Sequence, residues 1–535
     1  MKITTAFFLL LAAANAGAGP AYPLKIASGG QRYLVDQNGA PFYMVGDAPQ
    51  TIMVQVSTND LETYLVDRAA RGFNTLWVYP VDACDQTGAP NNYYGIPPFD
   101  GADFTAEDPT YWALVDYEFS RMAYYGMLVL ADPGFVGLTP AGGYMNSYLN
   151  SSDATIYAYG NFLGNRYKNF TNIIWSLGGD ADPNQPGLYS KLQDLAVAIH
   201  SNAPNQLITF EAARYINNGT QDAPLGGYSS MDAALIAFGS IPSWLSLNWD
   251  YDVFAYTQLG ASNNYWRANA LPALMGEDWY EIGHGLTPMQ LREEAYWECL
   301  FGCNLGRICG NAAIWTMGGP KEGTNLTWQS QLGSPGSVAE EELGRLFQSR
   351  EFWLLVPDVR NTVMTAGYQS GPNLAVDAKT SDNHTVIAYI ATQNTVTMAM
   401  NNISGSVANA WWFNPSNGVP AFIASYYTTG TKTFTPPDTN DWVLVLDDAS
   451  QNYPPPGVGS VLGMDSLSIR LAGRRMYQLT VSGLPGQTYT FQFTTNVNGP
   501  WQTMGVGTAN RSGTFSINVS AMPTDTFYRA VRSGD

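Results

Sequence analysis

The chain contains 535 residues and carries a formal net charge of -19, although only 13% of its residues are charged. A chain of this length exceeds a single compact core, so about two or three domains are expected. The excess of acidic groups disfavours nucleic acids, anionic membrane surfaces and other polyanions as partners.

The N-terminus has the features of a secretory signal peptide. Lys2 precedes an apolar run over residues 6–14, and small residues follow at Ala14-Asn15-Ala16. This pattern predicts a signal peptide over residues 1–18 and a secreted or periplasmic bacterial protein. No later run reaches the roughly 18 apolar residues of a membrane-spanning helix, so we expect no membrane insertion.

Residues 24–356 alternate short apolar segments with amphipathic ones. The predicted strands cover residues 42–46, 75–79, 127–131, 173–177, 207–210, 244–248, 273–276 and 312–316. The predicted helices include residues 60–71, 111–125, 155–167, 188–201, 288–305 and 338–349. Such alternation indicates a parallel sheet, and eight units fit a (β/α)8 TIM barrel better than the alternative, a doubly wound sheet.

The pattern changes to period-two strands after residue 356. Residues 357–450 are predicted to form an all-β sandwich domain, because apolar and polar residues alternate between turn signals. Residues 451–461 contain Pro454-Pro455-Pro456 and are predicted to form an extended, proline-rich linker. Residues 462–535 alternate again and predict a separate C-terminal β-sandwich module.

Two carboxylates follow predicted strands. Asp180 follows the apolar run 172–177 and two glycines, and Glu277 follows the strand at 273–276. The carboxyl ends of barrel strands carry the active site in this fold, and a carboxylate pair is what glycosidic hydrolysis requires. The alternative for Asp180 is a helix N-cap, and Asp278 or Glu281 could replace Glu277 as the functional acid.

Five further side chains are predicted to line the mouth of the barrel as substrate-binding residues: Asp47, Tyr79, Asp132, Trp249 and Trp315. Asp47 ends the first strand and could bind sugar hydroxyls, or could instead form a salt bridge. Trp315 closes the last predicted strand and could stack on a sugar or pack inside the barrel. Tyr79, Asp132 and Trp249 occupy similar strand-end positions.

The cysteines and histidines do not predict a metal site. The four cysteines do not form a disulfide framework, because Cys299, Cys303 and Cys309 crowd one segment and Cys84 stands apart. With three histidines in the chain, a zinc site lacks nearby ligands. We therefore expect buried thiols, no metal and no cofactor.

Several motifs together resemble the apiosidase-like glycoside hydrolases, over about residues 24–448. The matching segments are Arg32-Tyr33-Leu34-Val35-Asp36, Val45-Gly46-Asp47, residues 68–74, residues 172–180, Gly276-Glu277, Ile314-Trp315, Trp412-Phe413-Asn414-Pro415 and residues 441–446. The resemblance implies a barrel followed by a β domain named for collagen binding, with Asp180 as catalytic acid/base and Glu277 as the second catalytic carboxylate. The sequence departs from the family at Ala48-Pro49, around Glu211 and at Cys309-Gly310, positions that would line the mouth and bear on the choice of sugar.

These observations lead to one functional hypothesis and one alternative. The hypothesis is a secreted, exo-acting and retaining glycoside hydrolase that removes a terminal sugar, such as apiose or another furanoside, from a plant-type polysaccharide such as pectin. The alternative is a non-catalytic carbohydrate-binding or adhesion protein on a barrel scaffold. A peptidase is disfavoured because the sequence lacks a His-Glu-x-x-His motif. The sequence gives no indication of oligomeric state.

Overall fold

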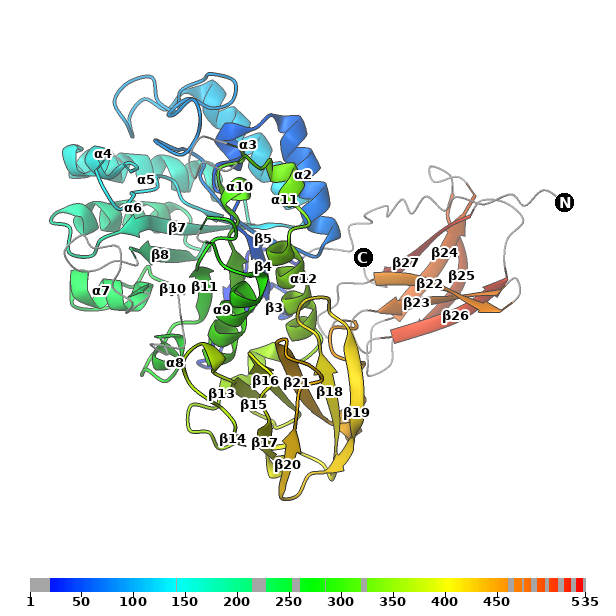
Figure 1. The fold of residues 1–535 in the computed structure, drawn as a ribbon. Coiled ribbons are helices and arrows are strands. Elements are labelled where there is room, and N and C mark those ends of the chain that lie inside the picture. Colours follow the sequence, from blue (N-terminus) through cyan, green and yellow to red (C-terminus); the bar gives the residue numbers. More distant parts are fainter. Residues whose placement is uncertain are drawn as a thin grey trace. The chain divides into compact units, whose positions relative to one another are not determined.

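The computed structural model describes residues 20–140, 142–213, 228–252, 260–283, 285–318, 325–459, 466–473, 476–482, 488–495, 500–508, 514–520 and 526–532. Two compact units are present, of which the larger spans Pro20–Val458 and the smaller includes Gly459–Asp535. Figure 1 shows both units. The predicted signal peptide lies outside the described residues.

A nearly closed barrel of eight parallel strands forms the first part of the larger unit, which confirms the predicted fold (Figure 1). Its strands are β4 (Met44–Asp47), β5 (Thr75–Val78), β6 (Leu128–Ala131), β7 (Ile173–Ala181), β8 (Ile208–Ala212), β10 (Asn248–Tyr251), β11 (Ala273–Glu277) and β12 (Gly306–Cys309). Parallel pairing of β12 with β4 joins the last strand to the first. The remaining gap between β8 and β10 is bridged where Ser246 N donates to Ile208 O at 2.8 Å.

Three short antiparallel strands precede the barrel, and one more extends it. The preceding strands are β1 (Lys25–Ile26), β2 (Leu34–Val35) and β3 (Pro41–Phe42), and β9 (Tyr228–Ser229) pairs antiparallel with β10. One apolar cluster fills the barrel interior and includes Trp77, Ile174, Trp249 and Leu274. Alternate residues of each strand face outward into a second apolar cluster shared with the helices.

Helices surround the barrel. They are α1 (Ile52–Gln55), α2 (Thr58–Ala70), α3 (Pro109–Tyr124), α4 (Met145–Asn150), α5 (Asp153–Tyr167), α6 (Leu188–Asn202), α7 (Ser230–Phe238), α8 (Gly260–Tyr265), α9 (Pro288–Phe301), α10 (Ala312–Trp315), α11 (Trp328–Gln331) and α12 (Pro335–Gln348). Local sequence explains several of their starts, because Ser57, Ser152 and Thr287 each accept a backbone N–H as N-cap residues. All six predicted helices are found with boundaries shifted by a few residues.

Two predicted strands are misplaced. The last strand is β12, whereas the segment predicted for it, residues 312–316, contains helix α10. The sixth strand is β10 and begins at the end of its predicted range, 244–248. Both observed strands carry a buried charged residue on their outer face, Arg307 and Asp250, so their sequences are less apolar than the neighbouring segments.

A β sandwich completes the larger unit. One sheet contains β13 (Leu355–Pro357), β15 (Val376–Thr380), β16 (Thr385–Ile390), β21 (Trp442–Asp448), β18 (Val407–Phe413) and β19 (Pro420–Tyr427), and the other contains β14 (Met364–Ala366), β17 (Val396–Ala399) and β20 (Thr431–Phe434). Short 3-10 helices lie at Phe352–Leu354, Gly371–Asn373, Met400–Asn402 and Ala449–Gln451. Helix α9 holds this sandwich against the barrel, because Arg292 pairs with Asp441 at 2.6 Å and the rings of Tyr296 and Tyr389 stack 4.8 Å apart.

The first part of the proline-rich segment is bound to the larger unit rather than extended as a spacer. Arg350 donates to the carbonyl oxygen of Pro454 at 3.0 Å, and the hydroxyl group of Tyr453 donates to Glu351. Gly457 N donates to Ser349 Oγ at 3.0 Å. The chain therefore stays attached to the end of helix α12 well past residue 450.

The smaller unit is also a β sandwich, as predicted. Its two three-stranded sheets are β22 (Ser466–Gly473), β23 (Met476–Ser482) and β26 (Thr514–Ser520), and β25 (Gln502–Thr508), β24 (Thr488–Thr494) and β27 (Phe527–Arg532). Leu479, Val481, Tyr489 and Phe491 form its buried core. Within the residues described for the whole chain, none of the helices has the length and apolar character needed to cross a membrane.

All four cysteines are free thiols, which agrees with the expected lack of a disulfide framework. Cys299, Cys303 and Cys309 are buried, and Cys84 is half-buried. Burial raises the pKa of Cys299 to about 12 and raises the pKa values of Cys303 and Cys309 well above their ordinary range. These thiols are therefore un-ionised and unreactive in the folded chain.

Candidate active site

Three carboxylates meet at the carboxyl ends of the barrel strands. Asp180 belongs to β7, Glu211 to β8 and Glu277 to β11. One oxygen atom from each lies within 4.8 Å of the other two. The structure thus brings together the two acids predicted from the sequence and adds a third, Glu211, which sequence reasoning did not select as a site residue.

A backbone bulge positions Asp180. Gly178, Gly179 and Asp180 have φ values of 105°, 52° and 59°, and the pairing of β7 with β8 skips from Leu177 to Ala181. Left-handed φ is uncommon for a residue with a side chain, and such strain concentrates at functional sites. Two backbone hydrogen bonds hold the bulge, from Val136 N to Gly178 O and from Gly137 N to Gly179 O, each at 2.9 Å.

The two glycines before Asp180 are required by close packing as well as by φ. A Cβ atom on Gly179 would lie 2.2 Å from a ring carbon of Phe135 and 2.7 Å from Asp132 Oδ2. These distances are too short for any side chain, so the Gly-Gly pair lets the strand turn Asp180 out beside its neighbours. The hypothesis that Asp180 is a helix N-cap is wrong, because helix α6 begins at Leu188 and Gly187 is its N-cap residue.

Glu277 is held by the residues that flank it. Gly276 lies flat against Trp249, since a Cβ atom there would stand 2.0 Å from the indole ring. Tyr280 forms a hydrogen bond with Glu277, and Gln50 Nε2 donates to the Tyr280 hydroxyl oxygen at 2.8 Å. Burial first, and then the negative charge of Glu277, raise the pKa of Tyr280 well above its usual value, so Tyr280 stays protonated.

The neighbouring acids Asp278 and Glu281 form an ion pair and hydrogen bonds with other side chains of the barrel. Arg307 Nε donates to Asp278 Oδ2 at 3.0 Å in a buried ion pair. Glu281 accepts hydrogen bonds from Asn311 Nδ2 at 3.0 Å and from Ser334 Oγ at 2.6 Å. Of the three acids in this segment, Glu277 is the one that joins the carboxylate cluster.

Glu211 is fully buried beside the other two carboxylates. Burial raises its pKa well above the usual range, and the charge of Glu277, a hydrogen bond with Glu277 and the charge of Asp180 raise it further. The sequence signal for Glu211 was an acid at the end of the fifth strand, in Ile208-Thr209-Phe210-Glu211-Ala212. No Gly-Gly or Gly-acid motif marks it, so it resembles an isolated polar residue in an apolar run.

Tyr79 and Asp132 also lie beside the cluster. Both are buried, and within the described part of the chain Tyr79 OH and Asp132 Oδ2 have no hydrogen-bond partner. Burial raises the pKa of Asp132 to about 8, so its carboxyl group is largely protonated at neutral pH. The ring of Tyr79 stacks on Phe135 with centroids 5.0 Å apart, which fixes its hydroxyl group near Glu211 and Tyr280.

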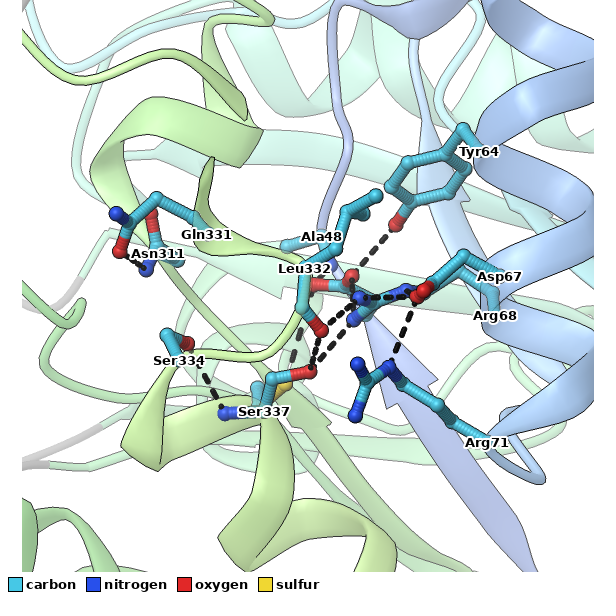
Figure 2. A network of polar contacts seen from close by, with 12 residues as sticks. Ala48, Tyr64, Asp67, Arg68, Arg71, Asn311, Gln331, Leu332, Ser334 and Ser337 are labelled. Carbon is cyan, nitrogen blue, oxygen red and sulfur yellow. Dashed lines mark hydrogen bonds and ion pairs between the residues drawn. The ribbon is translucent and has the colours of Figure 1, made fainter. Parts of the chain in front are cut away.

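Asp47 forms a buried ion pair with Arg68 at the end of the first barrel strand. Its side chain is 1% exposed, and Oδ2 accepts hydrogen bonds from Tyr64 OH at 2.5 Å and from Arg68 Nη1 at 3.1 Å. Its Oδ1 accepts the backbone N–H of Ala48 at 2.9 Å. Figure 2 shows Arg68 at the centre of this network, which continues to Ser337. The salt-bridge alternative for Asp47 is therefore the one that the structure supports.

The two tryptophans differ in position. Trp249 is fully buried in the barrel interior, where its ring meets Trp77 edge-on with centroids 4.8 Å apart, so it packs the barrel. Trp315 lies on helix α10 after the last strand, is half-buried, and meets Tyr280 edge-on at 5.5 Å. Trp315 therefore contacts Tyr280, which in turn forms a hydrogen bond with Glu277 of the carboxylate cluster.

Several acidic groups could hold a cation, and one of them is the active-site cluster itself. Asp180, Glu211 and Glu277 each offer an oxygen atom, as do Asp250 and Glu298 beside Cys303. A third group includes Asp82, but its Oδ2 already accepts the backbone N–H groups of Asp85 and Gln86 in a turn. Acidic proximity alone does not define a metal site, and the expectation of a metal-free enzyme stays a prediction.

Two family models match consecutive parts of the chain. Residues 28–354 match the family model described as "Apiosidase-like, catalytic domain", and residues 356–447 match "Putative collagen-binding domain of a collagenase". A comparison with curated proteins returns no match.

Solved structures with similar folds include a protein described as "Glycoside hydrolase", which is 22% identical with a TM-score of 0.68 and is matched over 80% of this chain and 98% of its own. A family 5 glycoside hydrolase from Bacteroides vulgatus ATCC 8482 is 20% identical with a TM-score of 0.67, over 82% of this chain and 95% of its own. At these identities the structural matches establish the fold.

Proposed function

Because the chain belongs to the apiosidase-like glycoside hydrolases, we propose that it is an exo-acting, retaining enzyme that removes a terminal furanoside such as apiose from a plant-type polysaccharide such as pectin. The observation that carries the proposal is the approach of Asp180 and Glu277 to within 4.8 Å at the mouth of the barrel. The type of sugar comes from the family description.

In the proposed reaction the two acids have different roles. Glu277 attacks the anomeric carbon as a carboxylate and forms a glycosyl-enzyme ester, while Asp180 protonates the departing glycosidic oxygen. Asp180 then removes a proton from water, which hydrolyses the ester and restores both groups. Tyr280 supports Glu277 through their hydrogen bond.

The separation of the acids supports retention. Retaining enzymes hold their carboxyl groups about 5 to 5.5 Å apart, whereas inverting enzymes keep roughly 6.5 to 9.5 Å to admit a water molecule. Oxygen atoms of Asp180 and Glu277 within 4.8 Å belong with the first class. This close approach leaves little room for the interposed water molecule that inversion requires.

Tyr79 and Asp132 are proposed to bind the sugar. Their buried oxygen atoms have no partner within the described residues, and an unsatisfied buried polar atom costs about 1 to 3 kcal/mol. A sugar hydroxyl between them would satisfy both. A protonated Asp132 would donate to that hydroxyl, and Tyr79 would donate or accept.

The test is a substrate screen with a stereochemical readout. The purified full chain should release a monosaccharide from the non-reducing end of pectic oligosaccharides, and ¹H NMR of the first-formed sugar should show the anomer of the substrate. First appearance of the opposite anomer would contradict retention, and release of internal fragments would contradict exo action. Carbohydrate binding without turnover of any oligosaccharide or aryl glycoside would instead favour the adhesion protein.

Secretion is part of the same proposal. The N-terminal pattern predicts removal of the first 16 to 18 residues during export. N-terminal sequencing of the protein recovered from a bacterial host should therefore begin near Gly17 or Gly19. An intact Met1 on a cytoplasmic product would contradict it.

A further inference from the structure

We propose that Glu211 is a positioning residue: its carboxyl group keeps its proton throughout the reaction and donates it in a hydrogen bond to Glu277, which holds Glu277 ionised and oriented for attack. The inference rests on the proposed function, in which Glu277 is the nucleophile. Nothing in the apiosidase-like motifs of the sequence points to this residue, because the chain departs from the family around it.

The location of Glu211 is the first argument. It is fully buried, whereas Asp180 and Glu277 are each partly exposed at the mouth. Gly178 of the bulge packs directly on the Glu211 backbone, which fixes the point where the Glu211 side chain leaves β8. No lysine or arginine in the described part of the chain forms an ion pair with it.

Charge repulsion is the second argument. Three carboxylates whose oxygen atoms lie within 4.8 Å of one another cannot all be ionised, since like charges at this range disfavour each other strongly. The proton that is hardest to remove is the one on the fully buried group, because ionisation costs most there. Within the described residues, the groups that face Glu211 carry no positive charge; they are Glu277 on β11, Asp180 on β7, Asp132 after β6, Tyr79 after β5 and Tyr280 after β11.

Glu211 takes part in the proposed reaction as a hydrogen-bond donor and neither gains nor loses a proton. A neutral Glu211 donates one hydrogen bond to the Glu277 carboxylate, and a hydrogen bond to an ionised acceptor is about twice as strong as a neutral one. The pKa of Glu277 is thereby lowered, so more of the enzyme carries the nucleophile in its reactive form. When Glu277 becomes an ester its charge is lost, and the Glu211 proton remains in place for the hydrolytic step.

Two substitutions separate this role from simple packing. Glu211→Gln keeps a neutral hydrogen-bond donor of the same size, whereas Glu211→Leu keeps bulk and removes the donor. The acidic limb of the pH profile of kcat/KM should be unchanged in Glu211→Gln and shifted upward by about one pH unit in Glu211→Leu, since Glu277 then ionises less readily. Thermal unfolding of both variants shows whether the barrel is intact.

Either of two kinetic results would overturn the proposal. A folded Glu211→Gln that is as inactive as Glu277→Gln would mean that Glu211 must ionise and acts as a base or nucleophile. A folded Glu211→Leu with the acidic limb of the wild type would mean that Glu211 only fills space.

A spectroscopic measurement tests the proton without any substrate. In protein labelled with ¹³C at glutamate carboxyl groups, several resonances should have the shift of a neutral carboxyl at pH 7, because burial also raises the pKa values of Glu118 and Glu298 well above their usual range. One of these resonances should disappear in Glu211→Gln while the others stay. The same resonance should titrate at a lower pH in Glu277→Gln, because the neighbouring charge is gone. If Glu211→Gln lost none of the neutral-carboxyl resonances at pH 7, the Glu211 assignment would be refuted, whereas failure of the substrate screen alone would refute only the proposed function.

Discussion

Gly178 of β7 lies directly against the backbone of Glu211 in β8: a Cβ atom on Gly178 would stand 2.2 Å from the Glu211 carbonyl oxygen. The bulge that presents Asp180 and the strand that carries Glu211 are thus in van der Waals contact through a position that tolerates hydrogen alone. The spacing of two active-site acids depends on this contact.

Replacing Gly178 should lower kcat/KM by more than the accompanying loss of unfolding free energy can account for. Gly178→Ala would push β7 and β8 apart, and displacement of reacting groups by about 1 Å can reduce rates about 100-fold. Gly187→Ala is the matched control, because Gly187 also has a left-handed φ of 79° but its Cβ would meet nothing closer than 3.9 Å. The control should lose about 1 kcal/mol of unfolding free energy and keep its kcat/KM. Equal kcat/KM in both variants would contradict the role of this packing.

The two catalytic acids should respond differently to the leaving group. Glu277→Gln should lower kcat/KM at least about a thousandfold on every substrate, because the nucleophile is lost. Asp180→Asn should retain measurable first-step turnover of an aryl glycoside whose phenolate leaves without a proton. Asp182→Asn, two residues further along the chain and just after β7, is the control and should behave like the wild type. Wild-type turnover by Glu277→Gln would remove Glu277 from catalysis.

Asp47 should matter for folding and not for substrate binding. Asp47→Asn removes one partner of a buried ion pair, which should lower the free energy of unfolding by about 3 kcal/mol. Asp67→Asn also loses a contact with Arg68, but Asp67 is 26% exposed, so its loss should be about 1 kcal/mol or less. Chemical denaturation measures both. A raised KM in Asp47→Asn without loss of stability would restore the sugar-binding interpretation.

Stability should depend on pH through Asp250. Burial raises the pKa of Asp250 in the folded chain to about 7, whereas an unfolded aspartate has a pKa of about 3.9. Between these values the unfolded state releases a proton that the folded state keeps, so the free energy of unfolding falls as pH rises and levels off above about pH 7. The contribution of this group is on the order of 4 kcal/mol, since one pKa unit corresponds to about 1.4 kcal/mol.

Asp250→Asn should remove this part of the pH dependence, and denaturation at several pH values measures it. The exposed Asp100→Asn serves as the control and should follow the wild-type curve. A curve for Asp250→Asn parallel to that of the wild type would show that Asp250 does not titrate in this window.

The contacts of the proline-rich segment decide where the chain can be shortened. A protein ending at Val458 keeps the hydrogen bonds of Tyr453, Pro454 and Gly457 and should unfold like the full-length larger unit. A protein ending at Asp448 loses them and should be less stable by about 2 to 3 kcal/mol, because one of them involves the buried Arg350 guanidinium. Calorimetry on both proteins compares them. Identical unfolding temperatures would mean that the segment is a passive spacer.

Asp180 and Glu277 could be found from the sequence because each follows an apolar strand through glycine, and strand ends converge in a barrel. The same reasoning could not reveal Glu211, whose importance depends on which two side chains face it. Nor could it show that the Asp47 carboxylate accepts hydrogen bonds from Tyr64 and Arg68. Both partners lie on helix α2, and the sequence does not reveal how this helix is oriented against the first strand.

The misplaced strands have a related cause. Arg307 makes β12 look unlike a buried strand, yet Asp278 and Glu340 neutralise it inside the protein, with Glu340 Oε2 accepting from Arg307 at 2.9 Å. Helix α10 has the apolar sequence Ala-Ala-Ile-Trp, so its composition resembles a buried strand more closely than that of β12 does. Where a buried charge is paired through tertiary contacts, hydrophobic pattern is a poor guide to strand position.

The burial of the three cysteines has a consequence for how the enzyme is inactivated by heat. Their thiols are protected only while the barrel is closed, and unfolding would return them to an ordinary pKa of about 8.5 in contact with solvent and with one another. In air-saturated buffer the unfolded chains should then cross-link through mixed disulfides faster than they refold. Heating should therefore be irreversible in an oxidising medium and largely reversible when a reductant is present.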